Sequence, residues 1–140
     1  MKSITTLTLF ILVIFLQGLA QPTSKTGLLC KTWKLQSIVP VYNGVDSIMP
    51  QKEIESQFIK FNKDSICEWI RGSEKSEGKW YFNNNGILIL RCIKINGNLN
   101  PLRDRESLFK IKELTSERLI IIYLGREDNT AYFYTLNKER

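Results

Sequence analysis

The chain contains no histidine among its 140 residues, and this absence excludes several classes of site. No His-dependent catalytic triad can form, no imidazole base titrates near neutral pH, and a zinc site of the His-rich type is impossible. Glycine-rich phosphate loops, EF-hand spacing and Cys-x-x-Cys pairs are also missing from the sequence. We therefore expect no metal site and no cofactor.

Cysteine is scarce, with only Cys30, Cys67 and Cys92 in the chain. In an exported protein one pair can oxidise, which leaves one thiol over. Cys67 and Cys92 both fall on predicted strands and form the candidate disulfide, although two small buried apolar side chains fit the pattern equally well. No histidine is available to activate any of these thiols, and paired carboxylates occur only in predicted loops. We expect no catalytic residue and no enzymatic activity.

Basic residues exceed acidic residues by a small margin, 20 against 14, for a formal net charge of +6. The Lys and Arg residues are scattered and form no block or stripe. A nucleic-acid-binding protein usually concentrates its basic residues on one face. The charge pattern therefore favours solvated strand faces over a nucleic-acid partner.

Only one long apolar run is present, and it lies at the N-terminus. Ile4 to Leu16 carries no charge and follows Lys2, and Gly18-Leu19-Ala20 places small residues at the −3 and −1 positions of a cleavage site before Gln21. The run is shorter than the roughly 20 residues of a membrane span, and no basic cluster follows it. Residues 1–20 are thus predicted to be a cleaved secretory signal, with a membrane anchor as the alternative. We expect an exported protein (periplasm, cell surface or medium) without a membrane span after cleavage.

The rest of the chain, residues 21–140, is long enough for one domain and too short for two. Eight short apolar segments fill most of it, each ended by turn-forming residues such as Asn83-Asn84-Asn85-Gly86. The connections are too short for helical crossovers, so neighbouring strands are expected to be antiparallel. The predicted strands are Leu28–Val41, Gln57–Phe61, Ser65–Arg71, Gly78–Phe82, Ile87–Ile95, Ser107–Glu113, Arg118–Leu124 and Thr130–Leu136.

An open meander of eight strands leaves two exposed edges, whereas closure into a barrel removes both. The sequence therefore predicts an all-β fold, an eight-stranded antiparallel up-and-down barrel, with a sandwich as the alternative. The longer connection Asn43–Gln57 is expected to be a loop or lid with at most one short helix, opened by Pro50, between the first two strands.

Period-two alternation predicts which side chains point into the barrel. A barrel of this size is either filled by its side chains or holds one small ligand, and the pattern leaves both open. The predicted inward residues are Trp33, Leu35 and Val39, then Trp80 and Phe82, Phe109 and Ile111, and Ala131 and Phe133. The candidate ligand-lining residues are Trp69, Trp80, Phe82, Phe109 and Phe133, with Asn43–Gln57 and the loop Asn96–Glu106 framing the mouth.

Two further features concern the outside of the barrel. Ile87–Leu90 and Leu119–Leu124 are apolar on both faces, so their outer face is expected to be covered by Asn43–Gln57, covered by a second copy in a homodimer, or exposed as a patch. The mixed-charge segment Leu102–Glu106 is either a rim that grips an anionic head group or a solvated loop.

Several segments resemble the small bacterial lipocalin-like domains, which are of the calycin type. They are Leu28–Ile38 around Trp33, Glu77–Phe82 with the Asn-Gly turn and Ile87–Leu90, Phe109–Ile120, and the closing Tyr132-Phe133-Tyr134; Gln21 after the cleavage site resembles exported proteins of the Bacteroidota. This chain departs from the family's G-x-W motif, because Lys31 stands where the motif has glycine.

The resemblance implies that Trp33 closes the base of the barrel and that a basic residue after the last strand, Lys138 or Arg140, packs across its ring. It implies an exported lipocalin-like domain that binds a small hydrophobic ligand inside the barrel. The alternative is a non-enzymatic interaction or structural barrel with a filled core.

Overall fold

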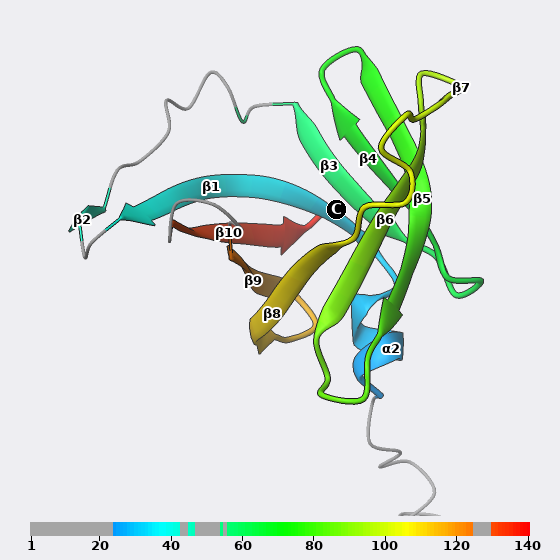
Figure 1. Cartoon of the computed structure of the whole chain (residues 1–140). Helices are drawn as coiled ribbons and strands as arrows, with labels where there is room; N and C mark the ends of the chain where they lie inside the picture. Colours follow the sequence, from blue (N-terminus) through cyan, green and yellow to red (C-terminus); the bar gives the residue numbers. More distant parts are fainter. Residues whose placement is uncertain (1–23, 43–44, 47–53, 55, 125–129) are drawn as a thin grey trace, which may run out of the picture.

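A computed structural model of the chain describes residues 24–42, 45–46, 54, 56–124 and 130–140 (Figure 1). This part of the chain is almost entirely β-structure, with one short helix ahead of the first strand. The elements are α2 (Lys25–Leu29), β1 (Thr32–Tyr42), β2 (Val45–Asp46), β3 (Gln57–Phe61), β4 (Ile66–Arg71), β5 (Glu74–Phe82), β6 (Leu88–Ile95), β7 (Asn98–Leu99), β8 (Ser107–Leu114), β9 (Arg118–Leu124) and β10 (Ala131–Lys138).

The long strands form a closed antiparallel barrel. Each pairs with its neighbour in the order β1-β3-β4-β5-β6-β8-β9-β10, and β10 pairs back onto β1, which closes the ring of eight strands. The β1–β10 seam is extensive and runs from Trp33 opposite Lys138 to Val41 opposite Ala131. The two-residue strands β2 and β7 each fold back and pair antiparallel with the end of β1 and of β6, respectively. The predicted eight-stranded up-and-down barrel is confirmed, and the sandwich alternative is excluded.

The predicted hairpin between β5 and β6 is present, and two of its residues explain why the turn is tight. Gly86 has φ of +72°, a left-handed conformation that costs a glycine nothing. The side chain of Asn83 accepts hydrogen bonds from the backbone N–H groups of Asn85 and Ile87, each at 3.0 Å. The turn therefore depends on one glycine and one asparagine cap.

The start of the fold differs from the expectation. Leu28 and Leu29 belong to α2 rather than to the first strand, because the Ser24 side chain accepts a hydrogen bond from the Gly27 N–H at 3.0 Å and caps a single helical turn. The helix predicted behind Pro50 falls mostly outside the described residues. Within that segment Ile54 is described, with helical backbone and a side chain that is 3% exposed.

A β-bulge in β1 changes which residues face inward. Leu35 pairs with Leu136 and Ser37 with Thr135, so Gln36 is an extra residue that shifts the alternation by one. Trp33 and Leu35 are buried as predicted, but beyond the bulge Ile38 takes the inward position and is 7% exposed. The predicted inward position of Val39 was therefore wrong.

The alternation of β10 is also the reverse of the predicted one. Tyr132 and Tyr134 pack against the core and Leu136 is buried, which places Ala131 and Phe133 on the outer face. Phe133 pairs with Val39 and Ile122, and the ammonium group of Lys112 lies 5.3 Å from the centre of its ring. Ala131 and Phe133 were assigned to the wrong face, and Phe133 does not line the interior.

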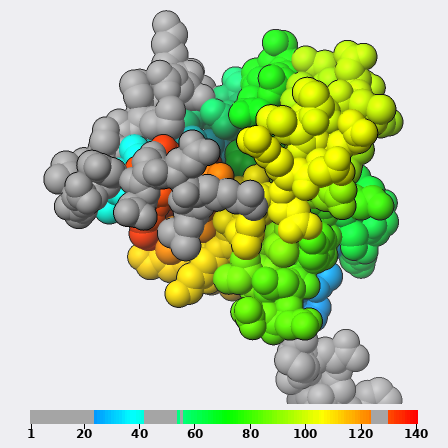
Figure 2. All heavy atoms as spheres, viewed as in Figure 1, coloured from blue at the N-terminus to red at the C-terminus, as the bar shows by residue number. Residues whose placement is uncertain are grey.

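The outer face of β6 is covered within the single chain. Ile89 is 6% exposed and lies in register between Tyr81 of β5 and Leu108 of β8. The segment between β7 and β8 crosses the outside of the sheet, where it forms the yellow surface over β5 and β6 (Figures 1 and 2). No helix in the described part of the chain is long and apolar enough to span a membrane.

Candidate functional site

The end of the barrel next to α2 is sealed. Leu29 and Trp33 are completely buried there, and the indole N–H of Trp33 donates to the Leu29 carbonyl oxygen at 2.9 Å. This bond ties the helix to the first strand and leaves no polar atom of the indole ring unpaired. Trp33 thus occupies the base of the barrel, as the resemblance implies.

The cation over the Trp33 ring is Lys31. Its Nζ lies 5.7 Å from the ring centre and donates to the Ser116 carbonyl oxygen at 2.8 Å. Lys138, one of the two expected partners, lies exposed beside Glu117, with 3.8 Å between Nζ and Oε1. Arg140, the other, is exposed at the end of the chain. Lys31 therefore makes the contact that the resemblance to lipocalin-like domains assigned to a C-terminal basic residue.

The next layer of the interior is filled by aromatic side chains. Trp80 contacts Phe61 and Phe82 edge to face, at centroid distances of 5.6 and 6.0 Å. Its indole N–H donates to the Asn62 carbonyl oxygen at 3.0 Å, and its side chain is 3% exposed. Trp80 and Phe82 were both predicted to line a ligand cavity, but they pack against each other in the core and are absent from the lining of the cavity described below.

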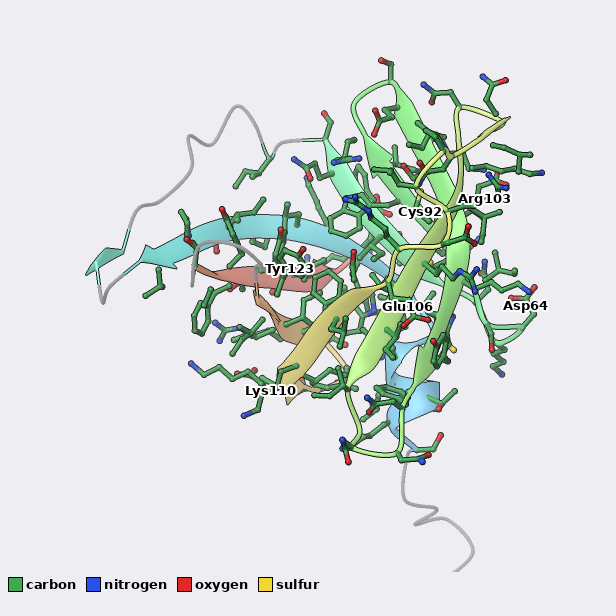
Figure 3. All side chains as sticks on the ribbon, viewed as in Figure 1. Asp64, Cys92, Arg103, Glu106, Lys110 and Tyr123 are labelled. Atoms are coloured by element: carbon green, nitrogen blue, oxygen red, sulfur yellow. The ribbon has the colours of Figure 1, made fainter. Side chains whose placement is uncertain are left out.

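The half of the barrel away from α2 has a second aromatic cluster. Phe109 lies 5.3 Å from Tyr123 and 6.1 Å from Tyr134, and Tyr134 contacts Trp69 edge to face at 6.1 Å. Tyr132 continues the row beside Tyr123, whose ring lies within the barrel (Figure 3). Phe109 therefore packs against the tyrosines that the inward prediction missed.

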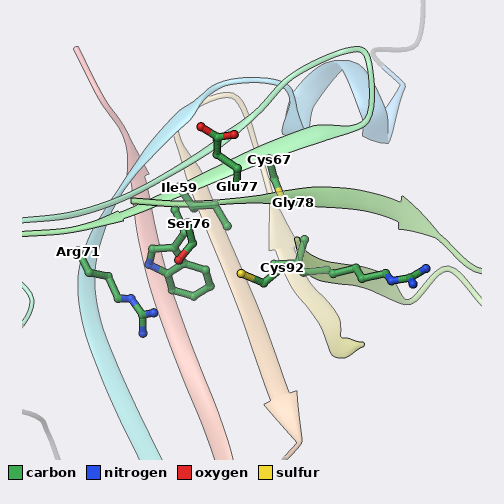
Figure 4. A pocket seen from close by; sticks show the side chains of 10 residues that line it. Ile59, Cys67, Arg71, Ser76, Glu77, Gly78 and Cys92 are labelled. Carbon is green, nitrogen blue, oxygen red and sulfur yellow. The ribbon is translucent and has the colours of Figure 1, made fainter. Parts of the chain in front are cut away.

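A cavity of about 160 Å³ lies against β4, β5 and β6 in this open half. Of the predicted ligand-lining residues, it contains Trp69 alone. Arg71, Ser76 and Cys92 point toward the same space (Figure 4). The lining is completed by Ile59, Cys67, Trp69, Glu77, Gly78, Leu90 and Arg91.

Ser76 is the most deeply buried hydroxyl on this wall, with 8% of the residue exposed. It stands opposite Trp69 in the β4–β5 pairing. Its hydroxyl has no hydrogen-bond partner among the described residues, and it faces the cavity. An apolar cavity containing one unpaired hydroxyl is suited to a ligand with a single polar group.

Arg71 marks the outer end of the cavity. Its Nη2 lies 2.6 Å from Oε1 of Glu74, its guanidinium lies 5.9 Å from the Trp69 ring centre, and its side chain is 52% exposed. Burial raises the pKa of the Tyr134 hydroxyl, while the positive charge of Arg71 acts in the opposite direction. Arg71 is thus a cation at the boundary between solvent and the aromatic interior.

The two cysteines in the cavity are on strands that do not touch. Cys67 of β4 and Cys92 of β6 each pair with Gly78 of the intervening β5, and all three cysteines are free thiols. Strands two apart are separated by about 9–10 Å, beyond the roughly 7 Å between Cα atoms that a disulfide can bridge. This register does not accommodate the candidate disulfide. Burial raises the pKa of the Cys67 thiol to about 12, with the neighbouring Cys92 adding to the effect.

The loop expected to frame the mouth instead packs on the outside of the barrel. The Arg91 side chain donates to the Arg103 carbonyl oxygen and to Asp104, each at 2.9 Å, and Tyr81 donates to Glu106. The two acidic side chains of Leu102–Glu106 thus bond to Arg91 and Tyr81 on the outer face of β5 and β6. Asn43–Gln57, the other expected part of the mouth, lies largely outside the described residues.

Neither a family model nor a curated protein matches this chain. The likeness to lipocalin-like domains therefore stays a prediction based on the quoted segments. Among the residues that the structure describes, no group of three or more Cys, Asp or Glu side chains gathers as a metal site would require. The candidate site is the cavity of β4–β6 with its apolar wall, its buried hydroxyl and its rim arginine.

Sequence reasoning missed Ser76 and Arg71 because both are polar and neither belongs to a motif. Their positions could have been found from alternation. Cys67, Trp69 and Arg71 share one face of β4, and Ser76 shares a face of β5 with Trp80. Once Trp69 and Trp80 are placed inward, both polar residues follow them into the barrel.

Proposed function

We propose that this chain is an exported lipocalin-like domain that binds a small hydrophobic molecule in the open half of its barrel. The observation that carries this proposal is the cavity of about 160 Å³, lined largely by apolar groups, in a barrel whose other end is sealed by α2, Trp33 and Trp80. Binding would remove apolar ligand surface from water inside a preformed cup. No bond is made or broken, in keeping with a non-enzymatic function.

Tryptophan fluorescence can test the binding. Trp69 lines the cavity, whereas Trp33 and Trp80 are buried in the sealed half. Titration with a panel of hydrophobic compounds, from single-ring molecules to long-chain fatty acids, should change the emission of the wild type. The Trp69→Phe variant should lose most of that change. Constant emission and constant thermal stability across the panel would contradict the proposal.

Export is supported by the uncharged apolar run that follows Lys2 and by the small residues Gly18 and Ala20 before Gln21. Cleavage after Ala20 would remove none of the residues that the structure describes. Expression of the full chain in a bacterium, followed by mass determination of the purified protein, should give a chain that starts at Gln21. Recovery of the uncleaved chain from the cytosol would argue against export.

A second candidate is a protein-interaction barrel, which we propose would act through a homodimer. Apolar side chains are exposed around the segment between β6 and β8: Leu99 is 65% exposed, Leu102 52% and Leu108 39%. Light scattering over a range of concentrations should then show a dimer that Leu102→Ser weakens. A monomer at all concentrations would leave the ligand carrier as the single candidate.

A further inference from the structure

The size of the β4–β6 cavity restricts what it can hold. Its volume of about 160 Å³ is below the roughly 300–1,000 Å³ typical of sites for drug-sized ligands. Apolar cavities of about 150 Å³ in proteins take up benzene. A single ring therefore fits within this cavity, whereas most of a long acyl chain would lie outside it, in contact with water.

The polar groups of the cavity indicate where a head group would bind. Ser76 offers one donor and two acceptor positions, the residue is 8% exposed, and its hydroxyl bonds to no protein group in the described part of the chain. No side-chain N or O atom shut off from solvent lacks a partner among the described residues, so water reaches this hydroxyl through the cavity, and a ligand that displaces the water must replace its hydrogen bond. A ligand atom that accepts or donates a hydrogen bond would therefore be favoured beside Ser76.

Arg71 adds a positive charge within reach of the same head group. Trp69 pairs with Ser76 and Arg71 with Glu74, so Arg71 and Ser76 are diagonal neighbours on one face of the β4–β5 pair. Diagonal neighbours lie about 7–8 Å apart, a distance that a long side chain spans. One Nη atom of Arg71 contacts Glu74, and the other guanidinium N–H groups can bind a carboxylate.

The other charged side chains at the cavity already have partners. Glu77 lies 3.3 Å from the ammonium group of Lys75, and Arg91 lies 2.9 Å from Asp104. Glu74 is the direct competitor for Arg71, since a ligand carboxylate would exchange with it or share its guanidinium. The affinity of the cavity for a carboxylate therefore depends on both Arg71 and Glu74.

We propose that the cavity binds a carboxylate of single-ring size. The ring lies against Trp69, Ile59 and Leu90, and the carboxylate binds the guanidinium of Arg71 and the hydroxyl of Ser76. This inference rests on the proposed function and specifies its ligand class.

Three probes of different size and charge test the inference: benzoate, benzyl alcohol and hexadecanoate. Calorimetric titration of the mature chain should show that benzoate binds roughly tenfold more tightly than benzyl alcohol, because only benzoate carries the charge that Arg71 recognises. Hexadecanoate should not bind. Equal affinity for the two ring compounds would overturn the assignment of a carboxylate, and binding of hexadecanoate without benzoate would overturn the assignment of size.

Matched variants identify the residues responsible. Arg71→Gln should weaken benzoate roughly tenfold and leave benzyl alcohol unchanged, whereas Glu74→Gln should strengthen benzoate by removing its competitor. Ser76→Ala should weaken both ring compounds. Unchanged benzoate affinity in Arg71→Gln would refute the role of Arg71 even if the variant folds normally, which its melting temperature reports. Failure of the whole probe panel, hexadecanoate included, would instead remove the proposed function itself.

Discussion

Gly78 lies on β5 between Cys67 and Cys92, where β5 and β6 approach closely at a bulge. A Cβ atom at this position would lie 2.1 Å from the carbonyl oxygen of Arg91, so a side chain requires the two backbones to separate. We expect Gly78→Ala to lower the free energy of unfolding by about 1–3 kcal/mol, as overpacking does elsewhere. Urea unfolding measures the loss. Lys79→Ala, one residue along and exposed, should change the stability by less than about 0.5 kcal/mol; similar losses in both variants would contradict this account.

Lys31 makes two contacts that seal the base of the barrel, one with the Trp33 ring and one with the Ser116 carbonyl oxygen. Lys31→Met keeps the length of the side chain and removes the charge. We expect a loss of about 1–2 kcal/mol in the free energy of unfolding, from the cation–π contact and the hydrogen bond together. Lys138→Met is the matched control, because its exposed ion pair with Glu117 contributes little. A larger loss in Lys138→Met would restore the C-terminal lysine to the role implied by the resemblance.

Among the elements, strand β1 contains a bulge, and removing the extra residue should not change which of its side chains point inward. Gln36 is the extra residue, so its deletion leaves Leu35 and Ile38 on the inner face of a regular strand. Deletion of Lys34 instead brings Trp33 next to Leu35 and turns one of these two buried side chains outward. We expect the Gln36 deletion to cost about 1–2 kcal/mol and the Lys34 deletion to prevent folding, as seen by near-ultraviolet circular dichroism and urea unfolding. Equal losses of stability in the two deletion variants would show that the bulge does not determine which side chains of β1 point inward.

Such bulges explain how far the sequence predicts this fold. Strand number, antiparallel order and closure follow from apolar segments and tight turns, and alternation places Trp80 and Phe109 inward correctly. Alternation fails at Val39, because an extra residue leaves no mark in the pattern. It also fails in β10, where aromatic residues occupy both faces and only the buried Leu136 distinguishes them. A polar site residue such as Ser76 carries no signal of its own, and alternation finds it only after Trp69 and Trp80 have been placed inward.

The whole molecule divides into two halves with different roles. Next to α2, the interior is packed around Trp33 and Trp80, and every indole N–H there has a carbonyl partner. In the other half, Trp69 lines a space together with Ser76 and the rim residue Arg71, and Tyr134 packs against Trp69 from the side. The sealed half provides the rigidity that a preformed site requires, and the aromatic half provides the surface that a ligand would contact.

The barrel as a whole is expected to lose stability at alkaline pH. Burial raises the pKa values of Cys67, Cys30 and Tyr134, so the folded chain keeps protons that the unfolded chain releases. For Cys67 the stabilisation is complete below the unfolded pKa of 9.0 and is lost as the pH rises toward the folded pKa of about 12.

We expect Cys67 alone to account for a loss of about 2 kcal/mol in the free energy of unfolding between pH 8 and 10.5, given roughly 1.4 kcal/mol per pKa unit. Urea unfolding of the reduced protein at both pH values measures this loss, and Cys67→Val, which has no thiol to ionise, should lose correspondingly less. Parallel declines in the wild type and in Cys67→Val would show that the thiol ionises as readily in the barrel as in the unfolded chain, and hence that the wall of the cavity is open to water.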